Sequence, residues 1–182
     1  MATERQVPSK AALLDALRSS EREVLARVRS LPEAELEQGR YENGWNARQI
    51  LAHVASIEWS YPRLIDIARQ APTPAANAEP AEARQTGRQE PSGTRSTTPR
   101  GGIDDYNQRQ VEKRAGASVE ELLAEFQKNR AATIAAVEAV DEALLTTPIR
   151  SAGGISGPLA GVIDAIAVRH IMTHVNDIAG AG

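Results

Sequence analysis

Hydrophobic residues recur with the period of an α-helix in four long segments of the chain, and no segment alternates between polar and apolar residues as a strand does. Within each segment the apolar residues fall on one side, which is typical of helices that pack side by side. The four predicted helices cover approximately Ser9–Ser30, Asn46–Arg69, Ser118–Val140 and Pro158–Ile178.

Three of these segments begin with residues that commonly cap helices. Ser9 is a candidate N-cap for the first helix. Asn46 with Gln49, and Ser118 with Glu121, have the spacing of a capping box, in which two side chains satisfy backbone N–H groups reciprocally. Inside the second segment, Pro62 should kink the helix or begin a new one, because proline cannot donate the usual backbone hydrogen bond.

Residues 71–102 differ in kind from the rest of the chain. They contain five of the ten prolines, four glycines and no large apolar residue. Such a segment cannot bury enough surface to offset the entropy of ordering it, so we expect a long, disordered connection between the second and third main helices. A short amphipathic segment, Asp104–Arg114, follows it.

The predicted fold class is therefore all-α. We expect one domain over residues 1–182, a four-helix bundle carrying residues 71–102 as a flexible insertion. A chain of 182 residues is long enough for one hydrophobic core and short for two.

Composition restricts the function classes. The chain has no cysteine, so disulfides and thiolate ligands are excluded, and any metal site must use histidine, carboxylate or water. A formal charge of −3 with interspersed signs gives no basic surface for nucleic acid. No apolar run is long enough to cross a membrane or resembles a secretory signal, so we expect a cytoplasmic protein.

The candidate chemistry lies in the three histidines of the chain, His53, His170 and His174. At about 100° per residue, His170 and His174 continue the apolar stripe of the last helix, and His53 lies at the edge of the buried stripe of the second. One interpretation is three core histidines, each hydrogen-bonded to protein. The other is a single divalent metal ion that satisfies all three imidazoles, which are costly to bury without partners.

Three neutral nitrogen ligands leave the charge of an ion uncompensated and one coordination position open, as in catalytic zinc sites. Imidazole suits several divalent metals, of which we expect zinc or nickel. Two further residues are candidates for roles nearby. Asp177 could orient an imidazole of the last helix, and Arg130, which interrupts the apolar stripe of the third, could bind an anionic substrate group or reach the solvent at the rim. Trp45 and Trp59 are interpreted as packing residues.

The segments NGWNARQILAHVASIEW and VRHIMTHVNDI resemble the DinB-like superfamily of metal-binding four-helix bundles. In that superfamily, one histidine of the second helix and a HxxxH pair of the last helix bind the metal, and these positions fall on His53, His170 and His174. The segment IDDYNQRQVEKRAGASVEELLAEF is similar to the branch that contains the colibactin self-resistance proteins. The resemblance implies a divalent metal and, by analogy with mycothiol-dependent members, a low-molecular-weight thiol as cofactor.

Two functions follow as alternatives. The first is a metal-dependent enzyme acting on a small molecule, either a hydrolase or a thiol-dependent transferase or isomerase. The second is a small-molecule binding or self-resistance protein in which the metal is secondary. The expected partners are a small-molecule substrate and a second copy of the chain in a homodimer, with no nucleic acid and no membrane.

Overall fold

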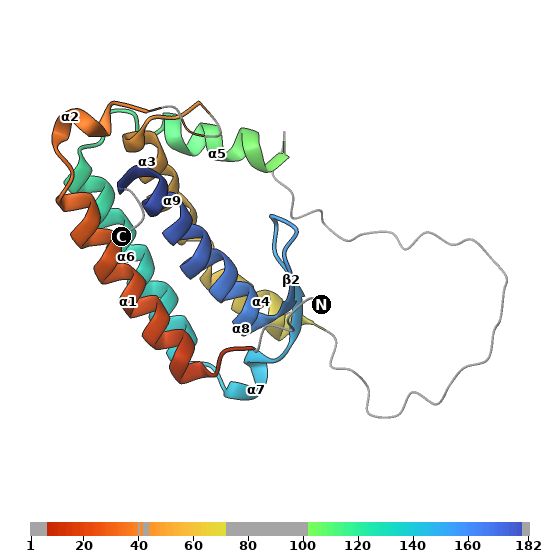
Figure 1. Ribbon diagram of the computed structural model, residues 1–182. Helices are drawn as coiled ribbons and strands as arrows, with labels where there is room; N and C mark the ends of the chain where they lie inside the picture. The colour runs from red at the N-terminus through yellow and green to blue at the C-terminus, as the bar shows by residue number, and fades with distance from the viewer. Residues whose placement is uncertain (1–6, 40, 42–43, 72–101, 180–182) are drawn as a thin grey trace, which may run out of the picture.

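The computed structural model describes residues 7–39, 41, 44–71 and 102–179 (Figure 1). The predicted disordered connection, 71–102, therefore lies outside the described residues except at its two ends. Ala71 follows the C-terminus of one helix, and Gly102 begins another.

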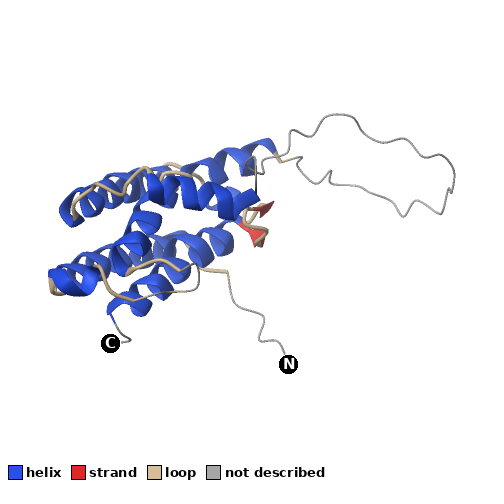
Figure 2. Ribbon diagram, turned by 90° about the horizontal axis from the view of Figure 1, so that it is seen from above, coloured by secondary structure: helices blue, strands red, loops and turns tan. Residues whose placement is uncertain are grey.

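The described chain forms an all-α four-helix bundle, as the sequence predicts, with the long helices packed side by side (Figures 1 and 2). The second and fourth members are each made of more than one helical segment. The bundle consists of α1 (Lys10–Arg29), α3 (Ala47–Glu58) with α4 (Pro62–Gln70), α6 (Val119–Glu138), and α8 (Leu159–Ile163) continued by the π-helix η1 (Asp164–Arg169) and α9 (His170–Ala179).

The helices begin where the capping residues predict. The Ser9 hydroxyl accepts a hydrogen bond from the backbone N–H of Ala12 at 3.2 Å. Both predicted capping boxes are present, at Asn46 before α3 and at Ser118 before α6. Pro62 begins the new helix α4 instead of kinking a continuous one, because its fixed φ suits the first helical position.

Several short elements were not predicted. They are the one-turn helices α2 (Glu33–Leu36) and α7 (Glu142–Leu145), and the strands β1 (Pro148–Arg150) and β2 (Ser156–Pro158). The two strands pair as a small antiparallel hairpin in an otherwise helical fold. Its turn depends on Gly154, whose φ of +85° favours glycine, and its strands are too short to show an alternating pattern. The amphipathic helix α5 runs from Gly102 to Glu112 and packs on α3.

The hydrophobic core is divided into two clusters by a layer of polar side chains. One cluster surrounds Phe126 and the other surrounds Ile163. In the layer between the two clusters, each main helix contributes a buried polar side chain or a backbone carbonyl. The buried side chains of this layer are Ser20, Glu58, Arg130 and Thr133. Among the described residues, no helix is long and apolar enough to cross a membrane.

Candidate metal centre

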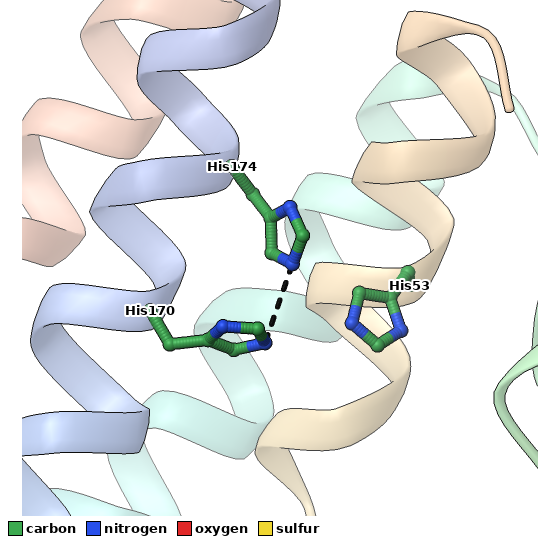
Figure 3. Close-up of side chains that lie close together, drawn as sticks. All are labelled: His53, His170 and His174. Atoms are coloured by element: carbon green, nitrogen blue, oxygen red, sulfur yellow. Dashed lines mark hydrogen bonds between the residues drawn. The ribbon is translucent and has the colours of Figure 1, made fainter. Parts of the chain in front are cut away.

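The three imidazoles lie together, on two helices that are distant in sequence (Figure 3). One ring nitrogen from each of His53, His170 and His174 lies within 4.8 Å of the others. The Nε2 atoms of His170 and His174 are 3.2 Å apart, and the His53 ring centroid is 5.1 Å from that of His174. These distances allow small movements of the rings to bring all three nitrogens around one ion at about 2.0–2.1 Å.

Two nitrogens of this cluster are buried without a partner. The Nδ1 atoms of His53 and His174 have no hydrogen bond within the part of the chain that the structure describes. Asp177 does not supply one, because its Oδ2 lies 4.0 Å from His174 Nδ1, beyond hydrogen-bonding distance, and its side chain is largely exposed. The structure thus gives no support to an orienting role for Asp177.

The surroundings keep the imidazoles neutral. Burial, reinforced by the two neighbouring histidines, lowers the pKa of His53 from 6.5 to about 3. Burial and then His170 lower the pKa of His174 to about 4, and burial also lowers the pKa of His170. All three rings are therefore deprotonated at neutral pH, which is the state that a metal ligand requires.

The rings do not face the core in the way that the helical angles predict. His53 is buried, with 3% of its surface exposed, but His174 is only partly buried and His170 is exposed. The π-helix η1 widens the helix by one residue before His170 and changes its phase by about 100°. As a result the buried positions of α9 are Ile171, Val175 and Ile178, while the histidines lie one residue to the side.

A pocket of about 460 Å³ opens beside the histidines. Its size is within the range of small-molecule sites. His53 and His170 line it, together with residues of α4, α5, the β-hairpin and the turn after α3. Trp59, interpreted as a packing residue, is instead 37% exposed and lines this pocket, whereas Trp45 is buried, with its ring centroid 5.2 Å from that of His53.

The comparisons with known proteins concern the family and the fold of the chain. The model of the DinB superfamily matches residues 16–178, which include all three histidines. The chain belongs to the DinB superfamily. A comparison with curated proteins finds no match.

Among solved structures, this DinB-superfamily chain is similar to a histidine-to-alanine mutant of the mycothiol-dependent maleylpyruvate isomerase. The TM-score is 0.66 and the sequence identity is 12%, so the similarity concerns the fold. The alignment covers 96% of this chain but 62% of the isomerase chain, which is therefore considerably longer.

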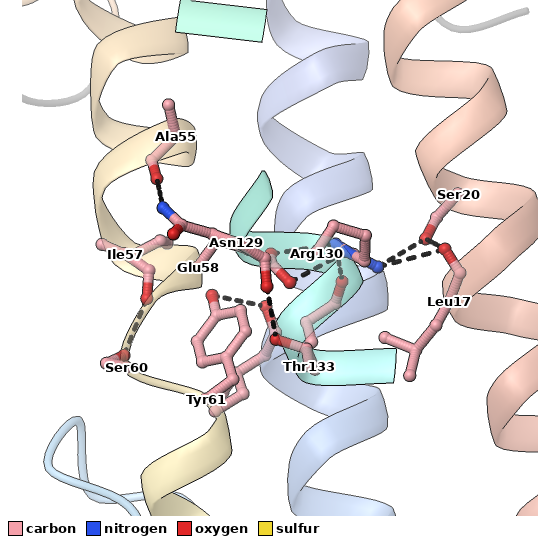
Figure 4. Close-up of polar contacts among 12 residues, drawn as sticks. Leu17, Ser20, Ala55, Ile57, Glu58, Ser60, Tyr61, Asn129, Arg130 and Thr133 are labelled. Carbon is pink, nitrogen blue, oxygen red and sulfur yellow. Dashed lines mark hydrogen bonds and ion pairs between the residues drawn. The ribbon is translucent and has the colours of Figure 1, made fainter. Parts of the chain in front are cut away.

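Arg130 neither binds at the pocket nor reaches the solvent, so both sequence-based interpretations of it were wrong (Figure 4). Its side chain is fully buried in this DinB-superfamily bundle and pairs with the equally buried Glu58, at 2.8 Å between Nε and Oε1 and 3.0 Å between Nη2 and Oε2. It also donates to the hydroxyl of Ser20 and to the carbonyls of Leu17 and Ala167. These partners hold the guanidinium in the core, and Arg130 is not among the residues that line the pocket.

The Arg130 cluster also contacts the π-helix that sets the histidine phase. A π-helix leaves carbonyl groups poorly matched to the usual N–H partners. Arg130 Nη2 donates to the carbonyl of Ala167 at 2.6 Å, and the Tyr61 hydroxyl donates to the carbonyl of Ile166 at 3.0 Å. Two carbonyls of the π-helix are thus satisfied by side chains from α6 and from the turn before α4, one turn before His170.

Several residues of the site were missed from the sequence. Glu58 follows Ile50 and Val54 at four-residue intervals on the buried face of α3, and that spacing was a signal for a buried carboxylate. Arg63 and Asn107 line the pocket, but they come from α4 and α5, and only the tertiary arrangement places them beside the histidines.

Proposed function

We propose that this DinB-superfamily chain is a metal-dependent enzyme acting on a small molecule, with His53, His170 and His174 as the metal ligands. One observation carries the proposal: one ring nitrogen from each of three neutral imidazoles lies within 4.8 Å of the others, beside a pocket of ligand size that His53 and His170 line. Three imidazoles that converge on one point supply a typical ligand set for a metal ion.

The donor set fits a divalent zinc or nickel ion. It supplies three neutral nitrogens and no carboxylate, so a position for a water or substrate ligand stays available. When bound, such an ion acts as a Lewis acid and lowers the pKa of a coordinated water or thiol. The protein's own contribution is to hold the three rings deprotonated, through the burial that lowers their pKa values, and to exclude water on the Trp45 side of His53.

A low-molecular-weight thiol is the cofactor that we propose, with a transferase or isomerase reaction favoured over hydrolysis. The support is membership of the DinB superfamily and the fold shared with a mycothiol-dependent isomerase. Because the chain spans 62% of the length of that isomerase, the proposal extends to thiol use but not to maleylpyruvate as the substrate.

Metal analysis of the purified protein, with and without chelator, tests the metal site directly. We expect about one zinc or nickel ion per chain, lost on His53→Ala, and a calorimetric signal when mycothiol is titrated into the metal-loaded protein only. A protein that contains no stoichiometric metal and takes none up on titration would contradict the proposal.

The alternative is a small-molecule binding or self-resistance protein with the metal secondary. It is favoured by the apolar lining of the pocket, which suits ligand retention as well as catalysis. Tight ligand binding that is unchanged by chelator, without turnover in a thiol-dependent screen, would favour it. The homodimer and the cytoplasmic location stay predictions, and sedimentation analysis would test the first.

A further inference from the structure

Arg63 is the one permanently charged side chain among the described residues that line the pocket. It is exposed, and its guanidinium carbon lies 4.2 Å from the centre of the Trp59 ring. A cation–π contact of this kind occupies the face of the guanidinium and leaves its in-plane N–H donors available. No described carboxylate pairs with Arg63, in contrast to Arg18, Arg29 and Arg114 elsewhere on the surface.

The electrostatic surroundings of the pocket favour an anion. No aspartate or glutamate is among the described lining residues. Asp66, one turn after Arg63 on α4, pairs with Arg69, and Glu58 is turned into the core and paired with Arg130. The histidines are neutral, and a divalent ion bound to them would add positive charge without compensation. Arg63 is thus open to a ligand, and no described carboxylate pairs with it.

The walls of the same pocket are apolar. Five large hydrophobic residues are exposed in the described part of the chain, and three of them, Trp59, Ile67 and Ile103, line this pocket at 37% exposure each. Exposed apolar side chains that gather in one cavity commonly mark a binding site. The buried side-chain oxygen of Asn107, also at this wall, has no hydrogen-bond partner among the described residues. This oxygen is available as an acceptor for a ligand in the pocket.

We propose that the pocket binds a small organic acid with an aromatic or aliphatic body, whose anionic group pairs with Arg63. The guanidinium supplies the charge and the two-pronged donor geometry that a carboxylate matches. Trp59, Ile67 and Ile103 contact the apolar body. As a statement about substrate recognition, the inference rests on the proposed function. The binding itself can be measured without metal.

Calorimetric titration of chelator-treated protein measures ligand binding to the pocket separately from metal binding. Phenylacetate and phenylacetamide serve as probes, because they share the aromatic body and differ in the charge of one group. We expect wild type to bind phenylacetate roughly tenfold more tightly than phenylacetamide, as for a charge-assisted hydrogen bond at a partly exposed site. Arg63→Gln should abolish that preference while leaving phenylacetamide binding unchanged. Arg22→Gln, which alters an exposed arginine of α1 outside the pocket, should retain the preference.

Equal affinities for the two probes in wild type, a preference that survives Arg63→Gln, or no binding of phenylacetate would each overturn the inference. If phenylacetate binds through Arg63 but the native protein contains no metal, the pocket assignment stands and the metal-dependent function fails. If the native protein contains metal but wild type shows no preference for phenylacetate, the metal-dependent function stands and the pocket assignment fails.

Discussion

Two polar clusters lie within this bundle, and they differ in the partners that the protein supplies to them. Around Arg130, an ion pair with Glu58 and hydrogen bonds to Ser20 and two carbonyls hold a guanidinium that no solvent reaches. Around His53, buried ring nitrogens have no partner among the described residues. The first cluster pairs opposite charges within the protein, whereas the second brings together three neutral nitrogen ligands, which supports the proposed metal site.

The two clusters also respond to pH in opposite directions. Burial raises the pKa of the Glu58 carboxyl to about 7, although Arg130 and Thr133 act the other way. Burial lowers the pKa of His53 to about 3. In both cases burial favours the neutral form, but only Glu58 has a charged partner in the protein.

Breaking the Arg130 cluster should give the largest effect. Arg130→Met leaves Glu58 buried without its cation and removes the donor to the Ala167 carbonyl. We expect the free energy of unfolding to fall by about 3–5 kcal/mol, as for other buried ion pairs that lose one partner. Denaturation in urea measures it, with Arg22→Met as the exposed control, which should change stability by less than about 0.5 kcal/mol.

The double variant Glu58→Met/Arg130→Met separates the ion pair from simple packing. Because both charges are removed, much of the lost stability should return. If the double variant loses as much free energy of unfolding as the two single variants combined, the pair acts through packing alone. The contrast with the histidines would then be weaker.

The histidine cluster should show an intermediate effect that depends on metal. At free metal a hundredfold above its dissociation constant, binding to the folded state alone adds about 2.7 kcal/mol. For a chain of this size that raises the melting temperature by roughly 5–10 °C. Chelator should reverse the increase and leave a folded bundle, and in His170→Ala the melting temperature should be the same with and without chelator.

Thr173→Ala is the matched control for this experiment. Thr173 lies on α9 between the two histidines, is exposed, and hydrogen-bonds only to the carbonyl of Arg169 in its own helix among the described residues. It should respond to metal as wild type does. If wild type itself melts at the same temperature with and without chelator, the cluster is a core feature and the comparison with Arg130 loses its functional meaning.

A smaller effect should appear in the pH dependence of the metal-free protein. Below pH 6.5 unfolded His53 binds a proton that the folded state excludes, so its contribution to stability is lost as pH falls from 6.5 toward 3. Glu58, with its raised pKa, contributes stability below pH 4.5 that is lost as pH rises through 7. Urea denaturation between pH 5 and 7.5 measures the free energy of unfolding. In His53→Ala this free energy should fall less than in wild type as the pH drops, and in Glu58→Gln it should fall less as the pH rises. Identical profiles in all three proteins would contradict both pKa shifts.

The main helices were predictable because their signals are local. A 3.6-residue period and capping residues such as Asn46 and Ser118 are properties of short segments, and they fixed the starts of α1, α3 and α6 to within a residue. The three histidines could be chosen as candidates for the same reason, since an i,i+4 pair lies on one helix face wherever the helix packs.

The phase of the last helix could not be predicted in this way. It depends on η1, whose carbonyls are satisfied by Tyr61 and Arg130, residues 105 and 37 positions away in sequence. The partner of Arg130 and the pocket wall at Arg63 and Asn107 likewise depend on which helices become neighbours. No periodicity within one segment contains that information.

The smallest expected effect links the two clusters. Tyr61→Phe removes the hydrogen bond to the Ile166 carbonyl, 3.0 Å long, without changing the shape of the side chain. We expect a loss of about 1 kcal/mol in the free energy of unfolding. If this hydrogen bond helps to hold the π-helix, the loosened turn should also weaken metal binding several-fold, measured by competition with a chelating dye. Ser60→Ala is the matched control: it removes, next to Tyr61, a hydroxyl that donates to the Ile57 carbonyl three residues earlier, and it should leave metal affinity unchanged. A Tyr61→Phe protein that is less stable but binds metal as wild type does would show that the two clusters are independent.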